Sequence, residues 1–309
     1  MRRRSRSRLA IGSLAVGATA VAVLTASVLV TACEPTPPPG CVKAGLPRTV
    51  AYRSIPGVPA NLVSVDVYSP AEVCEAPVVM WVHGGGYQIG DKAGKGTANK
   101  VKLFNSKGWV FVSVNYRLTV AGDPDSANFP DHYEDVAAAI DWVHRSIRSY
   151  GGDPGRIALL GHSAGADIVS NVADNPRYLA GEGLPLSTID CAGPFDTEGF
   201  DKVASTVGEE SVQWKTALGD NPNYKIDTSA TRFITSSTDA PDTIGVYRGT
   251  ALRQQIEKAY VAKVATTGAK TALIDARGLT HEDVNVRIGA TGDQVMTPPL
   301  LSFLTTCFR

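Results

Sequence analysis

The segment Leu159–Ile168, LLGHSAGADI, places a serine between two glycines directly after an apolar run. A G-x-S-x-G segment is typical of a strained strand-to-helix turn that exposes a nucleophilic serine, although an ordinary tight turn has a similar composition. A serine hydroxyl is a poor nucleophile at neutral pH. Catalysis by Ser163 therefore requires a base, a side chain that orients the base, and hydrogen-bond donors for the oxyanion that forms when a carbonyl is attacked.

Donors for an oxyanion are predicted in Trp81–Tyr87, WVHGGGY, which follows an earlier apolar run. Three successive glycines allow the backbone to bend so that its amides face a nucleophile. A lone HGGG is also compatible with a flexible loop, but HGGG after one strand and GHSAG after a later strand seldom coincide by chance. The backbone amide of Ala164, directly after the serine, is expected to point toward the same oxyanion.

The chain has five histidines, and the position of each narrows the choice of base. His83 lies in the glycine loop, His162 precedes the nucleophile on its strand, and His144 falls on an amphipathic helix. His132 comes before the serine, whereas serine hydrolases with this turn have the chain order Ser, acid, His. His281, in GLTHEDVN after the last predicted strand, is therefore the expected base.

The elements that must position these groups follow from hydrophobic periodicity. Leu62–Tyr68 alternates apolar and polar residues, as in a half-buried strand near a sheet edge. Pro77–Val82 and Trp109–Asn115 are almost continuously apolar, as in central strands covered on both faces. Asp131–Tyr150 has apolar residues at helical spacing. Further strands are expected at Ile157–Leu160, Thr188–Ala192, Thr243–Tyr247 and Thr271–Asp275, with helices from Ser163 onward and at Ala251–Thr266.

This alternation of strands and helices predicts an α/β fold: a doubly wound, mostly parallel sheet with helices on both faces. The two motifs, with SVNYRL at Ser113–Leu118 and the block EDVAAAIDWV…GGDPGRIALLGHSAG, resemble the α/β-hydrolase superfamily, specifically carboxylesterases of the hormone-sensitive-lipase and feruloyl-esterase-like branches. The resemblance extends roughly from Val65 to the carboxyl terminus and is weakest at Asp196–Ala240. It implies these roles: Ser163 as nucleophile, Gly85, Gly86 and Ala164 as oxyanion donors, and Gly84 as a residue needed for the turn.

The orienting acid departs from the family pattern. In this fold the acid usually follows the strand before the last helix, but the matching segment Val246–Arg253, VYRGTALR, contains no carboxylate. Asp196, after the preceding strand, is the favoured acid because a carboxylate at that neighbouring strand end can reach the same imidazole. Asp239 and Asp242 are the alternatives, which apply if RFIT, Arg232–Thr235, forms the strand instead.

The amino terminus predicts export. MRRRSRSR is basic and Leu9–Ala32 has no charged residue, as in a signal peptide. A single membrane span is the alternative, because such a span takes roughly 20 apolar residues. VTAC, at Val30–Cys33, resembles the lipobox of bacterial lipoproteins, whose cysteine receives a lipid. We expect a signal peptide at 1–32, a proline-rich spacer at 33–40 and a catalytic domain at 41–309, anchored on the outer side of the cell membrane through Cys33.

Cysteines and charge limit the remaining possibilities. Export favours disulfides, and sequence neighbourhood favours the pairs Cys41–Cys74 and Cys191–Cys307 among the three possible pairings. The 30 basic and 30 acidic side chains balance, which argues against a nucleic-acid partner. The cysteines form no C-x-x-C motif of the kind that binds zinc, and we expect neither a metal nor a cofactor.

Together these features predict a serine carboxylester hydrolase that acts through an acyl-enzyme on small-molecule esters. Because the sequence has no evident long hydrophobic lid segment, we expect small or medium acyl groups. One alternative is an amide or formamide hydrolase, since the same groups cleave activated amides. The other is a non-catalytic binding protein of the same fold, against which the presence of both Ser163 and His281 argues.

Overall fold

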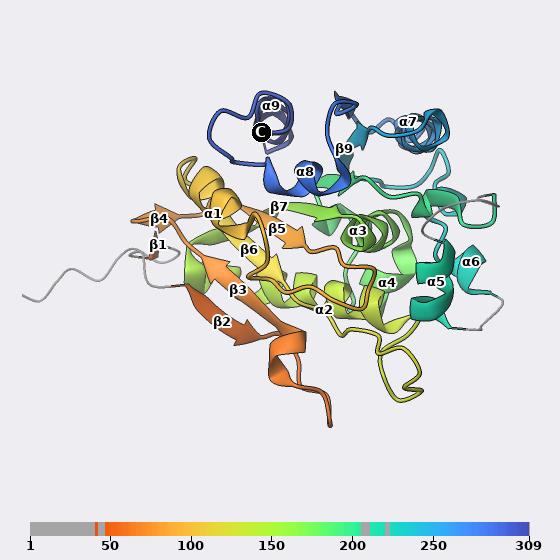
Figure 1. Ribbon diagram of the computed structural model, residues 1–309. Helices are drawn as coiled ribbons and strands as arrows, with labels where there is room; N and C mark the ends of the chain where they lie inside the picture. Colours follow the sequence, from red (N-terminus) through yellow and green to blue (C-terminus); the bar gives the residue numbers. More distant parts are fainter. Residues whose placement is uncertain (1–40, 43–46, 205–210, 220–222, 309) are drawn as a thin grey trace, which may run out of the picture. The chain divides into compact units, whose positions relative to one another are not determined.

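The computed structural model describes residues 41–42, 47–204, 211–219 and 223–308 (Figure 1). The expected signal peptide, the spacer and Cys33 lie outside these residues. In the part of the chain that is described, no helix combines the length and the apolar character needed to cross a membrane.

An eight-stranded sheet forms the centre of the described chain, with the strand order β10-β9-β8-β7-β5-β6-β3-β2. Strands β10 through β6 run parallel to one another, and β3 and β2 are antiparallel at one edge. The strands are β2 (Arg48–Ala51), β3 (Ser64–Tyr68), β5 (Ala76–Val82), β6 (Val110–Val114), β7 (Gly152–His162), β8 (Cys191–Phe195), β9 (Asp242–Tyr247) and β10 (Thr271–Asp275). The prediction of a mostly parallel, doubly wound sheet is confirmed.

Helices cover the sheet on both faces (Figure 1). The first core contains residues of α2, α3 and α4, and the second contains residues of α1, α8 and α9. The helices are α1 (Thr97–Asn105), α2 (Asp131–Ser146), α3 (Ala164–Asp174), α4 (Pro176–Gly181), α5 (Ser211–Leu218), α6 (Tyr224–Asp227), α7 (Ala251–Ala265), α8 (His281–Val286) and α9 (Thr297–Cys307).

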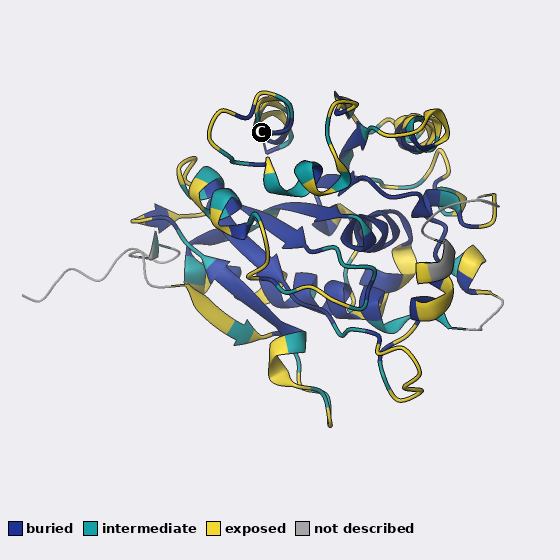
Figure 2. Cartoon of the chain, viewed as in Figure 1, coloured by how far each residue is buried: buried dark blue, intermediate teal, exposed yellow. Residues whose placement is uncertain are grey.

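Strand β5 shows why the central strands are apolar throughout. Val78, Met80 and Val82 belong to the first core, and Val79 and Trp81 belong to the second. Because successive side chains of a strand point to opposite faces, a strand between two layers of helices must be apolar at every position. The central strands are accordingly buried in Figure 2, while the edge strand β2 and the outer faces of the helices are mostly exposed.

Several elements begin or end at other residues than the sequence predicts. The expected strand Thr188–Ala192 begins three residues later, because Leu186–Thr188 forms a 3-10 turn and β8 starts at Cys191. The last turn of the expected helix Asp131–Tyr150 is also 3-10. RFIT forms no strand, because Ala230–Arg232 is a 3-10 turn and β9 starts at Asp242.

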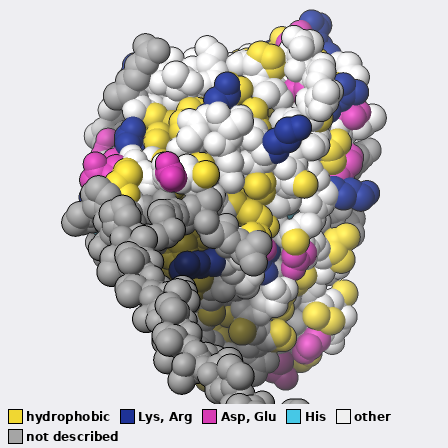
Figure 3. Space-filling model, turned by 90° about the vertical axis from the view of Figure 1, so that its left-hand side faces the viewer, with side chains coloured by type: hydrophobic (Ala, Val, Ile, Leu, Met, Phe, Trp, Pro, Cys, Tyr) yellow, Lys and Arg dark blue, Asp and Glu magenta, His cyan; other side chains and the backbone are white. Residues whose placement is uncertain are grey.

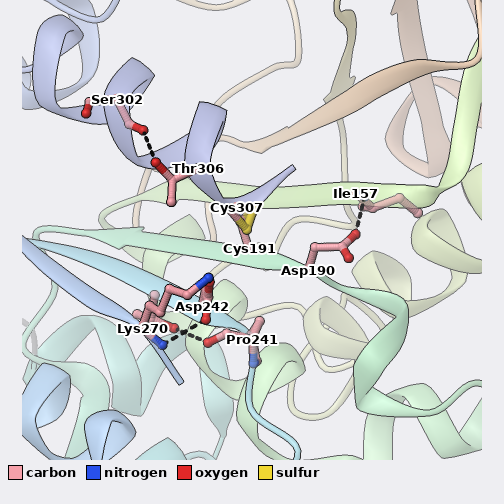
Figure 4. Close-up of a disulfide and its surroundings, with 10 residues drawn as sticks. Ile157, Asp190, Cys191, Pro241, Asp242, Lys270, Ser302, Thr306 and Cys307 are labelled. Carbon is pink, nitrogen blue, oxygen red and sulfur yellow. Dashed lines mark hydrogen bonds and ion pairs between the residues drawn. A yellow bond between two sulfur atoms is a disulfide. The ribbon is translucent and has the colours of Figure 1, made fainter. Parts of the chain in front are cut away.

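Two disulfides have the expected pairing. Cys41 and Cys74 join the short antiparallel strands β1 (Cys41–Val42) and β4 (Val73–Cys74). Cys191 and Cys307 join the first residue of β8 to the last residue of α9 (Figure 4). On the face shown in Figure 3, basic, acidic and hydrophobic side chains are interspersed, in keeping with the balanced charge of the chain.

Candidate active site

Ser163 lies at a sharp turn between a buried strand and a helix. Strand β7 ends at His162 and helix α3 begins at Ala164, so the serine has the left-handed φ of 58° and a ψ of −122°. Few non-glycine residues adopt a positive φ, which indicates strain held by the surrounding structure. This turn places the Ser163 side chain at the carboxyl end of the sheet, where the predicted base and oxyanion donors also lie.

The two glycines that flank the serine allow three backbone segments to approach closely. A Cβ added at Gly161 would lie 2.5 Å from the carbonyl oxygen of Gly165, and a Cβ added at Gly165 would lie 2.3 Å from that of Val82. Both distances are too short for a side chain. The G-x-S-x-G spacing is therefore required by the packing of α3 against β7 and β5.

The glycine loop after β5 passes next to Ser163. A Cβ added at Gly84 would lie only 3.0 Å from Ser163 Cβ, and Gly85 and Gly86 have φ values of 116° and 59°. Among the described residues, the backbone amides of Gly85, Gly86 and Ala164 donate no hydrogen bond to another protein group. These three amides are the ones that the sequence predicts as oxyanion donors.

A buried network behind this loop was not predicted from the sequence. The Tyr87 hydroxyl donates to Asp167 Oδ2 over 2.5 Å, and the Tyr133 hydroxyl donates to the same oxygen over 2.7 Å. The Lys202 ammonium pairs with Asp167 Oδ1, and all four side chains are buried. Because Tyr87 follows the glycine loop and Asp167 lies in the first turn of α3, the network connects the expected oxyanion donors to the nucleophile helix.

The structure brings His281 and Asp196 together. His281 is the first residue of α8, whose amino end carries a Thr280–Asp283 capping box. Its Nδ1 lies 2.6 Å from Asp196 Oδ2. Asp196 directly follows β8 with a φ of 66° and is fully buried, whereas the side chain of His281 is 42% exposed. A buried carboxylate in this position holds the imidazole tautomer whose Nε2 can accept a proton.

Neither alternative aspartate approaches the imidazole. Asp242 pairs in register with Cys191 at the amino end of β8, and its carboxylate accepts a hydrogen bond from Lys270 N over 2.8 Å (Figure 4). Asp196 follows the opposite end of β8, about 16 Å away at the usual rise of a strand. Asp239 is exposed in the loop that precedes β9. Both alternatives depended on an earlier strand at RFIT, which the chain does not form.

Two arginines that the sequence analysis did not assign surround Asp196. Arg253 Nε donates to Asp196 Oδ1 over 2.7 Å, and Arg248 Nε pairs with Oδ2. Burial raises the pKa of Asp196, but the hydrogen bond with His281 and the charges of Arg253 and Arg248 outweigh burial and hold the pKa below its ordinary value. The carboxylate is thus ionised at neutral pH. The sequence signal for these arginines was VYRGTALR, in which two arginines stand where the resemblance implies an acid.

His162, the last residue of β7, contacts His281. Its Nε2 donates to the carbonyl oxygen of His281 over 2.8 Å, and the two ring centroids are 4.4 Å apart. Burial and the neighbouring His281 lower the pKa of His162 to about 3, so it is neutral at physiological pH. In the described part of the chain, His162, Asp196 and His281 form the one group with the spacing of metal ligands. Hydrogen bonds within the site already account for this spacing.

Ser163, His162 and His281 line one cavity of about 780 Å³, and the buried Asp196 lies behind His281. Its wall includes Ser163, His281, the glycine loop, Arg248 and Arg253. Gln213 of α5 and Asn285 of α8 also line it, so the cavity lies at the carboxyl edge of the sheet under segments from the second half of the chain. The arrangement holds a strained serine, a hydrogen-bonded base and unpaired amides around one space, as acyl transfer requires.

Comparison with known proteins finds similarity to carboxylesterases. Residues 38–177 match the Carboxylesterase family. The chain is 35% identical to Carboxylesterase NlhH of Mycobacterium tuberculosis over 164 residues, which cover 50% of this chain and 47% of the relative. It is 33% identical to Gut esterase 1 of Caenorhabditis elegans over 120 residues, or 38% of this chain and 21% of the relative. The matched parts thus span between about a fifth and a half of these relatives.

Solved esterase structures share the fold. A bacterial heroin esterase aligns with a TM-score of 0.65 at 22% identity, covering 85% of this chain and 84% of the other. The esterase of Pyrobaculum calidifontis aligns with a TM-score of 0.63 at 21% identity, covering 80% and 82%. At this level of identity the likeness establishes the α/β-hydrolase fold.

Proposed function

Because its amino-terminal half matches carboxylesterases and its fold is that of esterases, we propose that this chain is a serine carboxylester hydrolase of the hormone-sensitive-lipase and feruloyl-esterase-like type. One observation carries the proposal: Ser163, on its strained turn, lines the same cavity as His281, whose Nδ1 is bound to the buried Asp196. Fold alone would not be enough, because one fold supports many functions.

The reaction follows from these positions. Ser163 Oγ attacks the ester carbonyl carbon while His281 Nε2 accepts the hydroxyl proton, and the resulting imidazolium is stabilised by Asp196. The carbonyl oxygen becomes an oxyanion next to the amides of Gly85, Gly86 and Ala164. Collapse of this intermediate breaks the bond to the alcohol, which takes the proton from the imidazolium. Water then attacks the acyl-enzyme by the same steps, and releases the acid and the free serine.

The proposed substrates are small-molecule esters with small or medium acyl groups, because the cavity of about 780 Å³ has the size of an ordinary small-molecule site. An amide or formamide hydrolase would use the same groups. The two activities differ in the leaving group, so matched esters and anilides of one acyl series distinguish them.

The test combines turnover with active-site labelling. The purified protein is assayed on nitrophenyl esters from acetate to laurate, and in parallel with a fluorophosphonate probe. We expect turnover that is highest for the shorter acyl chains, probe labelling of Ser163, and a loss on the order of a million-fold in kcat for Ser163→Ala. Full activity of Ser163→Ala, or a parent protein that neither turns over esters nor reacts with the probe, would refute the proposed function.

We further propose that the protein is exported and held at the outer side of the cell membrane by lipid on Cys33, on the strength of the VTAC segment after an uncharged run. A single acyl chain binds a membrane only marginally, so firm attachment needs the two or three chains of a bacterial lipoprotein. Mass spectrometry of the protein from membranes is expected to show a lipid-modified Cys33 as the first residue. An intact amino terminus with unmodified Cys33 would support the membrane-span alternative instead.

A further inference from the structure

The segment between β9 and α7 differs from the family pattern in a way that the structure explains. Strand β9 ends at Tyr247, Arg248 follows it, and Arg253 lies in the first turn of α7 after the cap residue Thr250. Arg248 and Arg253 thus occupy the region where the resemblance implies an acid. Both side chains turn toward the aspartate at the end of the neighbouring strand.

Arg253 holds Asp196 at two places. Its Nε donates to Asp196 Oδ1 and its Nη2 donates to the main-chain oxygen of the same residue, each over 2.7 Å. Its Nη1 also lies 3.2 Å from Glu198 Oε1, and only 9% of the side chain is exposed. A planar guanidinium forms such a fork with fixed geometry, which a lysine cannot reproduce.

Occupation of Oδ1 by Arg253 decides which oxygen meets the base. Asp196 Oδ2 is left facing His281 Nδ1, at 2.6 Å. Without the fork, nothing else in the described structure bonds Oδ1, and the carboxylate could rotate about its side-chain bonds. Asp196 also has a left-handed φ of 66°, a conformation that needs support from its surroundings.

Arg248 has a different relation to the site. Its Nε pairs with Asp196 Oδ2, and its Nη2 lies 2.9 Å from His281 Nδ1. Because Nδ1 carries either a proton or a lone pair, it cannot bond Asp196 and Arg248 at the same time. Arg248 therefore contacts the base directly, whereas Arg253 reaches it only through the carboxylate.

We propose that Arg253 is a positioning residue of the proposed esterase: it orients Asp196, and through Asp196 the catalytic imidazole. The inference rests on the proposed function, because it assigns Arg253 a role in that reaction. If Arg253 acts only through the carboxylate, its removal costs activity while the carboxylate is present and nothing further once the carboxylate has been neutralised.

A double-mutant cycle tests this dependence. The full-length parent, Arg253→Met, Asp196→Asn and the double variant are compared by kcat and KM on nitrophenyl acetate. We expect Asp196→Asn to lose about ten-thousand-fold in kcat, as for a serine protease. Arg253→Met should lose about a hundred-fold in kcat, the order of effect of a misplaced catalytic group, with KM changed less than threefold. The double variant should lie within threefold of Asp196→Asn.

Two further variants keep the result interpretable. Arg253→Lys keeps the charge but not the fork, and replaces Arg253→Met in the cycle if the latter does not fold. Arg287→Met is the matched control, because Arg287 pairs with Asp283 on the surface of α8 and is not part of the cavity wall. It removes one cation directly after the helix that carries His281, and we expect kcat within twofold of the parent.

The outcomes separate the two proposals. The positioning role alone would be overturned if Arg253→Met lowered kcat by the same factor in the parent and in Asp196→Asn. It would also be overturned if Arg253→Met by itself kept a kcat within threefold of the parent. Absence of turnover and probe labelling in the parent would overturn the proposed function and the positioning role with it. Non-additive losses, with Arg287→Met unaffected, are the expected result.

Discussion

The disulfide between Cys191 and Cys307 is expected to contribute more to stability than the disulfide between Cys41 and Cys74. It joins β8 in the middle of the sheet to the end of α9, across 116 residues. We expect the double variant Cys191→Ala/Cys307→Ala to fold but to lose a large part of its free energy of unfolding. The physical reason lies in the unfolded chain, where the crosslink removes conformational freedom that the reduced chain regains.

The length of the closed loop sets the magnitude. The chain-entropy relation gives about 5 kcal/mol for the sequence separation of 116 residues between Cys191 and Cys307, and about 4 kcal/mol for the separation of 33 residues between Cys41 and Cys74. The second pair joins only the two-residue strands β1 and β4, which can separate without disturbing the sheet. Local opening of this kind reduces the effect on global unfolding. We therefore expect the Cys41→Ala/Cys74→Ala control to lose about 2 kcal/mol or less.

Denaturant unfolding followed by the fluorescence of the four tryptophans measures the difference. The slope of the transition should rise slightly for Cys191→Ala/Cys307→Ala, because the unfolded chain becomes more expanded. Catalytic turnover of the folded variant should stay close to that of the parent, because Cys191 and Asp196 lie at opposite ends of β8. A loss below about 1 kcal/mol at unchanged slope, or a larger loss for the Cys41 and Cys74 pair, would refute the reasoning.

Three further predictions concern single side chains. In rate measurements on nitrophenyl acetate, Asp196→Asn should lose about ten-thousand-fold in kcat while Asp242→Asn stays within a few-fold of the parent; the reverse order would place the acid at the other end of the sheet. Burial raises the pKa of Asp174 to about 7, above its value in the unfolded chain, so its contribution to stability is lost as the pH rises from 4 through 7. The Tm of Asp174→Asn minus the Tm of the parent should therefore increase from pH 5 to pH 8. A Tm difference that stays constant over this range would contradict the linkage. Gly165→Ala should lower the free energy of unfolding by about 3 kcal/mol, because its Cβ would meet backbone at 2.3 Å. Gly181→Ala on α4, where a Cβ would meet nothing within 4 Å, should not be destabilised, and equal stabilities of the two variants would argue against the close approach at Gly165.

Much of the candidate site could be predicted from the sequence because its signals are local. The turn around Ser163 and the loop before Tyr87 need glycines at Gly84, Gly85, Gly161 and Gly165, where a Cβ would lie 2.0 to 2.8 Å from backbone atoms, so their spacing is visible in the chain. The doubly apolar pattern of β5 likewise follows from its place between two cores. His281 could be selected because His83, His144 and His162 fall on other predicted elements and His132 precedes the serine, against the expected chain order.

The choice among the candidate acids, and the contact of Arg253 with Asp196, depended on the tertiary structure. Asp196, Asp239 and Asp242 are the same residue type in loops near predicted strands, and only the starting points of β8 and β9 place Asp196 at the carboxyl edge of the sheet and Asp242 at the amino edge. A shift of a few residues in either boundary would have changed the choice, and boundaries follow from packing between distant segments. Arg253 joins the site for the same reason: 57 residues separate it from Asp196 along the chain, and the parallel pairing of β8 with β9 brings the two within 2.7 Å.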